Sequence, residues 1–438
     1  KPRWRVRAAT FEGDLADRAE EWQVMVTSSG DARSVRHKLP EGRPGASLDE
    51  ASARRLASEA VARRFGLDTA RGQLREISAS PAKLEARTDW TFMFEDKTIA
   101  PLALGEARVE VGIAGDEVAS VGRYLYIPEE WQRQQRAAET RKLMLRIAGA
   151  LTIAALLVSA AVIGVIAWSR GGYAPRLFVA AAGLMLTVSI VKAGNGWPTA
   201  LAGFSTAAPL PLQIGGMIGI GLIGLTLASV LVGLALGDVP RRLTGTSSLG
   251  DRHAAQLSVA GGFFAAAVAA LAWALRTPVW ARTPDVDGAG TLSPMLQAAI
   301  DPITSLLMAS AVVLSAFLLV DRLTAAWTRR RALGVIVLAV LGFLAGGAPA
   351  GIHAGGYFAG GAILAAAVVF AYSTLLRFDL TMVPLMLATM TAIGAVVRGI
   401  GRPYPGALAG SLCAALLAMA VGWWWFRTLR KWGHSGLR

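Results

Sequence analysis

Three aspartates lie in or beside the long apolar runs of the C-terminal part of the chain, and their carboxylates could carry chemistry there. Acidic residues within apolar spans are costly and often functional. Asp301, which a proline follows, is the strongest candidate. Asp321 directly precedes Arg322, which fits an exposed ion pair at an interface. Asp379 lies two residues from Arg377 and fits the same arrangement.

Two chemistries remain open for these carboxylates. A proton- or ion-coupled transporter could use Asp301 at mid-membrane, together with helix breaks around Gly346-Gly347-Ala348-Pro349 and Gly355-Gly356. An aspartyl intramembrane protease could share one proton between two aspartates. The Tyr-Asp and Gly-x-Gly-Asp strings of that class are absent, so the transporter is favoured of the two.

Histidine offers one further candidate. His353 lies among glycines in an uncharged loop, where a lone histidine is more often a structural hydrogen-bonding residue than a ligand. Residues 147–438 otherwise contain only His253 and His434, and they contain no glutamate. A hydrolytic metal site needs imidazole or carboxylate ligands and a nearby base. We therefore assign no catalytic residue and no metal ligand, expect no cofactor, and leave any cofactor-binding residues unassigned.

The composition shows where these residues must be placed. The chain has 438 residues, of which 54% are hydrophobic and 17% charged, and this is too apolar for a soluble globular protein. Residues 1–146 hold 25 of the 44 Lys and Arg and 23 of the 30 Asp and Glu. The chain therefore consists of two unlike pieces, and the single cysteine, Cys413, excludes a disulfide scaffold.

The second piece, residues 147–438, predicts a polytopic α-helical membrane bundle. A membrane-spanning helix needs about 20 apolar residues. Nine runs meet this criterion, and the sixth is interrupted by Gly346-Gly347 and closed by Pro349. The nine predicted spans are 147–168, 177–193, 212–236, 255–275, 296–320, 332–348, 358–376, 382–400 and 406–426. Glycines four apart along several spans indicate closely packed helices.

Lys and Arg in the connections predict the orientation, because basic loops stay in the cytoplasm. One set of alternate connections holds fourteen of them and the other set five. The C-terminus is therefore expected in the cytoplasm and the N-terminal domain outside the cytoplasm. An exported domain must be led across the membrane, so we expect a signal anchor or a cleaved signal peptide upstream. An uncleaved anchor would bring the number of spans to ten.

The first piece, residues 1–127, predicts a small α+β domain. Glu21–Thr27 and residues 32–39 flank a turn and fit a hairpin. A helix is expected to open at Ser47, with Glu50 completing a capping box, and to stop at Gly66. Further strands are expected at 89–94, 107–113 and 117–126. Residues 128–146 form a basic helical linker that extends the first span to the headgroup layer.

The order of strand pair, helix and further strands over residues 20–127 resembles PepSY-type domains, non-catalytic modules that bind or restrain a neighbouring partner. The whole layout resembles a long bacterial branch of the CAAX-type, abortive-infection-like (CPBP) intramembrane metalloproteases. The matching strings are Ile127-Pro128-Glu129-Glu130-Trp131, Gly196-Trp197-Pro198-Thr199, residues 204–210, and Thr291-Leu292-Ser293-Pro294. Members of that family resemble one another in three motifs, Glu-Glu-x-x-x-Arg, Phe-x-x-x-His and His-x-x-x-Asn/Asp. All three motifs are missing from residues 147–438 of this chain. The span expected to carry the acidic pair reads Ala-Ser-Ala-Val-Val-Leu-Ser at 309–315.

These observations favour a non-catalytic, pseudoprotease-like protein of the bacterial inner membrane. We expect it to act as a binding, scaffold or regulatory subunit of a membrane complex. Its expected partners are membrane lipid and a protein in the membrane or periplasm, with no nucleic acid. The uncharged exterior segment that begins at Asn195 could be a docking surface. Two alternatives stay open: a transporter that uses Asp301, and an active intramembrane metalloprotease.

Overall fold

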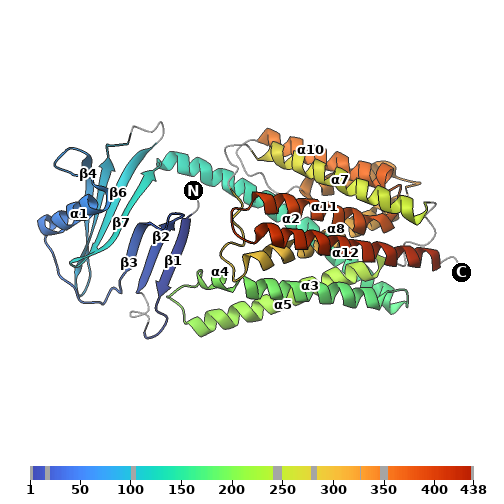
Figure 1. Ribbon diagram of the computed structural model, residues 1–438, viewed down its shortest axis with the longest axis horizontal. Helices are drawn as coiled ribbons and strands as arrows, with labels where there is room; N and C mark the ends of the chain where they lie inside the picture. Colours follow the sequence, from blue (N-terminus) through green and yellow to red (C-terminus); the bar gives the residue numbers. More distant parts are fainter. Residues whose placement is uncertain are drawn as a thin grey trace. The chain divides into compact units, whose positions relative to one another are not determined.

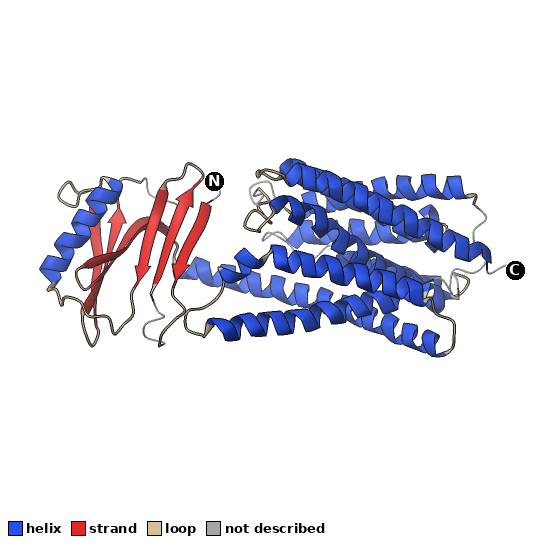
Figure 2. Ribbon diagram, turned by 60° about the horizontal axis from the view of Figure 1, so that its bottom comes forward, coloured by secondary structure: helices blue, strands red, loops and turns tan. Residues whose placement is uncertain are grey.

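The computed structural model describes residues 3–14, 20–99, 105–239, 249–277, 284–325, 327–345 and 354–435. The chain forms two compact units. The first, the sheet unit, comprises residues 1–137 and 201–218, and the second, the helical unit, comprises residues 138–200 and 219–438. Figures 1 and 2 show an antiparallel sheet with one covering helix in the first unit and a bundle of long helices in the second.

The sheet unit contains one antiparallel sheet of seven strands in the order β1-β2-β3-β7-β6-β5-β4. The strands are β1 (Arg3–Ala9), β2 (Glu21–Thr27), β3 (Ala32–Lys38), β4 (Leu74–Lys83), β5 (Thr88–Asp96), β6 (Glu106–Ala114) and β7 (Glu117–Tyr126). The predicted β2–β3 hairpin is confirmed, and so are the strands expected at β5, β6 and β7. Strands β1 and β4, which form the two edges of the sheet, were not predicted from the sequence.

Helix α1 (Glu50–Phe65) covers one face of β5, β6 and β7. Side chains alternate between the faces of a strand, so every second residue of β5 and β6 points at the helix. The core between them consists of Trp90, Phe92, Phe94, Val109, Val111 and Ile113 from the sheet and Ala53, Ala57, Ala60 and Val61 from α1. Small residues on α1 let it lie close to the aromatic side chains of β5.

The ends of α1 confirm one prediction and correct another. Gly66 ends the helix with φ at 68°, a left-handed conformation that glycine adopts readily. The N-cap is Asp49 rather than the expected Ser47, because the Asp49 carboxylate accepts a hydrogen bond from the Ser52 N–H at 3.1 Å. Ser47 instead forms a β-bridge with Thr88. An aspartate two residues further on thus displaces the predicted serine cap.

The helical unit is built from long apolar helices and short connections. They are α2 (Glu129–Ser169), α3 (Pro175–Asn195), α4 (Trp197–Leu201), α5 (Leu210–Gly237), α7 (Asp251–Arg276), α8 (Pro294–Thr324), α9 (Arg331–Ala345), α10 (Ala354–Phe370), α11 (Val383–Gly401) and α12 (Ala407–Ser435). A π-turn (Ala371–Leu375) follows α10, and a short 3-10 turn (Leu380–Met382) precedes α11. Apart from Pro128, the expected linker 128–146 and the first predicted span fall in the single helix α2.

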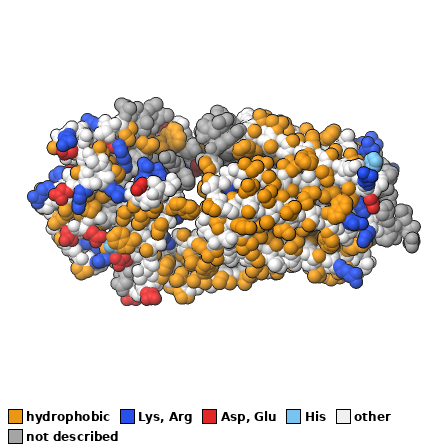
Figure 3. All heavy atoms as spheres, in the orientation of Figure 1, with side chains coloured by type: hydrophobic (Ala, Val, Ile, Leu, Met, Phe, Trp, Pro, Cys, Tyr) orange, Lys and Arg blue, Asp and Glu red, His pale blue; other side chains and the backbone are white. Residues whose placement is uncertain are grey.

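Eight helices are long and apolar enough to cross a membrane, counted over the residues that the structure describes. They coincide with eight of the nine predicted spans, and the chain is a multi-pass membrane protein by that criterion. The remaining prediction, 332–348, corresponds to the shorter helix α9, and its last residues lie outside the described part of the chain. Hydrophobic side chains cover the face of the helical unit seen in Figure 3, and basic side chains gather at the end that carries the C-terminus.

Helices α8 and α11 form the centre of the bundle and are the most buried of the eight. Helix α11 packs against α7, α8 and α12. The predicted close packing at glycine holds for α7, where a Cβ on Gly262 would lie 2.4 Å from Cβ of Thr389. It is wrong within the described chain for α5, where a Cβ added to Gly215, Gly216, Gly219, Gly221 or Gly224 would have no atom within 4 Å apart from the adjoining backbone of α5 itself.

Candidate functional site

Asp301, the strongest candidate from the sequence, lies in the first third of α8. Its Oδ1 is 2.7 Å from Nζ of Lys192 on α3 and accepts a hydrogen bond from Nε2 of Gln297 at 2.8 Å. Its side chain is 27% exposed and that of Lys192 is 45% exposed. The carboxylate that the sequence singled out is therefore neutralised by a lysine from another helix.

Asn195 fixes the same region by tying the end of α3 to the start of α8. Its Nδ2 donates to the carbonyl oxygen of Ser293 at 3.0 Å and to Oε1 of Gln297 at 3.1 Å. Its Oδ1 accepts from the Ser293 N–H at 2.8 Å. The uncharged segment after Asn195 folds against the loop that precedes α8, because the Thr199 hydroxyl donates to the Gly290 carbonyl in that loop at 3.1 Å. Asn195 is only 5% exposed, and these bonds explain why an amide can be buried there.

A second ion pair closes this end of the bundle. Nε of Arg402, just after α11, lies 2.8 Å from Oδ2 of Asp285, and the Tyr404 hydroxyl donates to the Asp287 carbonyl at 2.7 Å. Burial lowers the pKa of Arg402, but the hydrogen bond and charge of Asp285 outweigh it, so the pKa is raised. Burial also raises the pKa of the Tyr404 hydroxyl. Both residues thus keep their protons and hold the loop before α8 in place.

These side chains, Lys192, Asn195, Asp285, Gln297, Asp301 and Arg402, form what we name the polar end cluster. Each of its two carboxylates has a cationic partner within hydrogen-bonding distance. Its two amides bond to each other, and they also donate to the Ser293 carbonyl and to the Asp301 carboxylate. The chemistry of such a cluster is that of a structural tie between helices rather than of an acid or base held ready for a substrate.

The other two aspartates correct the sequence predictions. Asp379 is 3% exposed and pairs with Nη1 of Arg430 at 2.9 Å, not with Arg377. Asp321 accepts a hydrogen bond from the Tyr372 hydroxyl rather than forming a pair with Arg322. Both aspartates were expected at exposed interfaces beside a sequence neighbour. In the structure each bonds to a residue about fifty positions away, and Asp379 is buried whereas Asp321 is half-buried.

His353 lies outside the described residues, so its role stays a prediction. Among the residues that are described, no group of three or more His, Cys, Asp or Glu side chains could hold a metal ion. The stretch 309–315, where the resemblance would place an acidic pair, lies within α8, with Ala311 and Leu314 fully buried. The described residues thus offer no ligand set for a metalloprotease centre, and we derive no reaction step through a metal.

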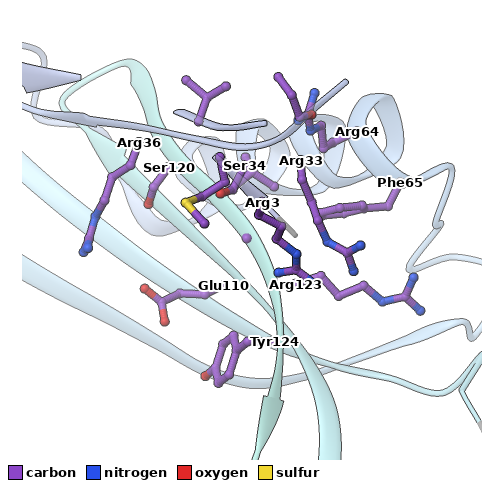
Figure 4. Close-up of a pocket in the computed structure, with 15 residues that line it drawn as sticks. Arg3, Arg33, Ser34, Arg36, Arg64, Phe65, Glu110, Ser120, Arg123 and Tyr124 are labelled. Carbon is purple, nitrogen blue, oxygen red and sulfur yellow. The ribbon is translucent and has the colours of Figure 1, made fainter. Parts of the chain in front are cut away.

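The sheet unit contains a feature that the sequence analysis missed, a cavity of about 540 Å³ between β3 and β7. These strands pair only at Val35 with Val121 and at Arg36 with Ser120, so they leave a groove beyond the paired residues. Glu110 is the one acidic residue of its lining. Five arginines also line it, namely Arg3, Arg33, Arg36, Arg64 and Arg123. We name this cavity the arginine groove. Figure 4 shows these arginines coming from several strands and the end of α1.

Two of the five arginines are already engaged. Arg123 forms an ion pair with Asp96, and Arg64 donates to the Ala32 carbonyl. No ion pair within 4 Å is found for Arg3, Arg33 or Arg36 anywhere in the described part of the chain. Arginine presents a planar fork of donors that matches carboxylate and phosphate. The groove is therefore chemically suited to an anionic ligand.

The chain was compared with family models, curated proteins and solved structures. No family model matches it, no curated protein matches it, and no solved structure matches it.

Proposed function

We propose that this chain is a non-catalytic, multi-pass protein of the bacterial inner membrane that acts as a binding, scaffold or regulatory subunit of a membrane complex. The arginine groove of the sheet unit is its binding site, and an acidic segment of a protein partner is its ligand. The resemblance in layout to CAAX-type proteases with a PepSY-like domain is part of this proposal. So is the orientation, with the sheet unit outside the cytoplasm and the C-terminus inside.

The observation that carries the proposal is the contrast between the two units. In the helical unit, Asp301, Asp379 and Asp285 each have a cationic partner at 2.7 to 2.9 Å. In the sheet unit, by contrast, the exposed side chains of Arg33 and Arg36 form no ion pair within 4 Å with any described residue. Charges that the fold itself does not neutralise are those available to a partner.

A peptide-binding measurement tests the groove. The full chain in detergent is titrated with a fluorescent octaglutamate peptide, and the double variant Arg33→Glu/Arg36→Glu is compared with Arg55→Glu/Arg63→Glu. The second pair carries the same change in charge on the exposed side of α1, outside the groove. We expect the groove variant to lose at least about tenfold in affinity, with binding that weakens as salt is added. Equal losses in both variants would mean that the peptide responds only to net charge.

Two further measurements test the proposed acidic partner and the proposed non-catalytic role. A photo-crosslinking residue at Ser34 in the groove should join the chain to one protein partner through a segment rich in Asp and Glu. Crosslinks to neutral or basic segments would contradict the proposed ligand. Metal analysis of the purified protein tests the non-catalytic part, because a stoichiometric zinc ion held by residues of the helical unit would overturn it.

The ion- or proton-coupled transporter is the second candidate, since Asp301 and Lys192 form an ion pair between two membrane-spanning helices beside Pro302. Such pairs can mark an ion or proton pathway. Replacing Asp301 with Asn should then abolish flux in reconstituted vesicles. A variant that retains flux would remove this candidate.

A further inference from the structure

The helical unit contains a cavity of about 580 Å³ between α7, α8, α9, α10 and α11. Its lining is almost entirely apolar, with Val312, Val313 and Ala316 from α8 facing Phe264 and Ala269 of α7. Small-molecule sites commonly have volumes of about 300 to 1,000 Å³ and apolar walls with a few polar groups. The cavity has the size and surface of such a site.

One cationic side chain lines this cavity, that of Arg276 in the last turn of α7. It is only 7% exposed. Its guanidinium lies 5.0 Å from the centre of the Tyr357 ring, and Nη2 reaches the Phe343 carbonyl at a long 3.4 Å. Its Nε and Nη1 meet no hydrogen-bond acceptor among the residues that the structure describes. Arg276 is thus a buried cation with two unused donors.

A buried charge is costly unless it is paired and hydrogen-bonded. The position of Arg276 at the C-terminal end of α7 offsets part of that cost through the helix dipole. Arg430, the other buried arginine described in the helical unit, has carboxylate partners at 2.8 and 2.9 Å, and Arg402, whose side chain is 7% exposed, has Asp285 at 2.8 Å. Arg276 differs from both, because the described residues give it no anion.

Two glycines of α10 let this helix lie directly against the end of α7, because they have no side chain. A Cβ on Gly356 would lie 2.3 Å from the Leu275 carbonyl oxygen, and a Cβ on Gly360 would lie 2.7 Å from Nε of Arg276. Helix α10 therefore passes so close to the end of α7 that the arginine is confined beside the cavity. The positive charge of Arg276 therefore stays at one place in the apolar lining of the cavity.

We propose that this cavity binds a single apolar chain that carries an anionic headgroup, with the headgroup at Arg276 and the chain along α8. The lining matches the apolar part, and the two unused donors match a carboxylate. Ala269 and Trp273 of the lining are exposed on the outer surface of α7, so the ligand enters sideways from the lipid phase. The site is separate from the arginine groove and does not depend on the function proposed for it.

Binding of tritiated palmitate to the purified full chain tests the site. Arg276→Gln should lose at least about tenfold in affinity, whereas Arg276→Lys, which keeps the charge, should lose less. Arg252→Gln is the matched control, since Arg252 is an exposed arginine at the other end of the same helix. Unlabelled palmitate should compete, and hexadecanol, which has the same chain without the charge, should compete poorly.

A second variant covers the case in which Arg276→Gln does not fold. Val313→Phe fills the cavity and leaves the arginine in place, so it should also reduce palmitate binding. The site is excluded if Arg276→Gln or Val313→Phe binds palmitate as the unaltered chain does. Equal competition by hexadecanol would show that no charge is recognised. Equal competition by dioleoyl phosphatidate would show that the cavity is not restricted to a single chain.

Discussion

Nζ of Lys192 lies 2.7 Å from Oδ1 of Asp301, and this ion pair joins α3 to α8 near one end of the bundle. Gln297 donates to the same carboxylate oxygen from one turn earlier in α8. The carboxylate is therefore held by two donors, one charged and one neutral. A residue bound in this way stabilises the helix pair whether or not it also moves a proton.

The first prediction concerns the strength of this ion pair. Both side chains are partly exposed, and exposed pairs contribute about 0.2 to 1 kcal/mol. Lys192→Met and Asp301→Asn should each lower the free energy of unfolding by no more than that amount. Thermal unfolding of the two single variants and the double variant gives the coupling energy. A coupling above about 2 kcal/mol would show that the pair is far better shielded than its exposure indicates.

The second prediction concerns Arg430, which is 3% exposed and pairs with both Asp379 and Asp251. Removing one partner of a buried ion pair leaves an uncompensated charge and costs about 3 to 5 kcal/mol. Arg430→Met should therefore unfold at a much lower temperature than the unaltered chain. Arg427→Met, one turn earlier and exposed, is the control and should change stability by less than about 1 kcal/mol.

Replacing the carboxylate as well should restore part of the loss. The double variant Arg430→Met/Asp379→Asn removes the buried charge that the single variant leaves unpaired, whereas Asp251, the other partner, is 68% exposed and stays solvated. A double variant less stable than Arg430→Met would indicate that Asp379 matters mainly for the hydrogen bonds it accepts from Thr381.

The positions of the helices could be predicted from the sequence, because a run of about 20 apolar residues is a local property. The hairpin and the later strands could also be predicted, since their alternation and turns are local. The partners of the aspartates could not. Asp379 has Arg377 two residues away, yet it pairs with Arg430, which only the packing of α12 brings near.

The arginine groove shows the same limit. Arg3 lies on β1, an edge strand that the sequence analysis did not predict, and Arg33 and Arg123 lie on strands that are ninety residues apart. Their gathering depends on the pairing of β3 with β7, which no local pattern specifies. Arg276 could be seen in the sequence only as a basic residue at a helix end. Its lack of an acidic partner is a property of the folded bundle.

The third prediction is the pH dependence of the sheet unit. Nε and Nη2 of Arg7 bond to the two carboxylate oxygens of Glu21 at 2.7 and 2.9 Å. These bonds hold the pKa of Glu21 below its usual 4.5, against the opposite effect of burial. A carboxylate whose folded-state pKa is depressed stabilises the fold above its unfolded pKa. That stabilisation is lost as the pH falls through the folded pKa.

Thermal unfolding of the full chain, followed between pH 7 and about pH 3, should show the sheet unit losing stability as the pH falls below the usual carboxylate range. Glu21→Gln should be less stable at neutral pH and should lose less on acidification. Glu59→Gln, an exposed position on α1, should follow the unaltered chain. Parallel curves for Glu21→Gln and the unaltered chain would assign the acid sensitivity to other groups, such as Glu20, whose pKa is lowered by its hydrogen bond with His37 and by Arg43.

The fourth prediction compares two glycines in membrane-spanning helices. A Cβ on Gly262 of α7 would lie 2.4 Å from Cβ of Thr389 and 2.7 Å from the Met386 carbonyl oxygen of α11. Gly219 of α5 has no described atom within 4 Å of the same position. Alanine at 262 must therefore push α7 away from α11, and such overpacking typically costs about 1 to 3 kcal/mol.

Alanine at 219 meets open space and should have the opposite effect, because alanine is the better helix former by about 0.5 to 1 kcal/mol. Gly262→Ala is expected to lower the unfolding temperature in detergent, and Gly219→Ala is expected to leave it unchanged or raise it. The two variants differ only in what surrounds the added methyl group. If Gly219→Ala destabilises the chain as strongly as Gly262→Ala does, then α5 packs against a surface that this chain alone does not supply, and the glycines of α5 belong to a contact with another molecule.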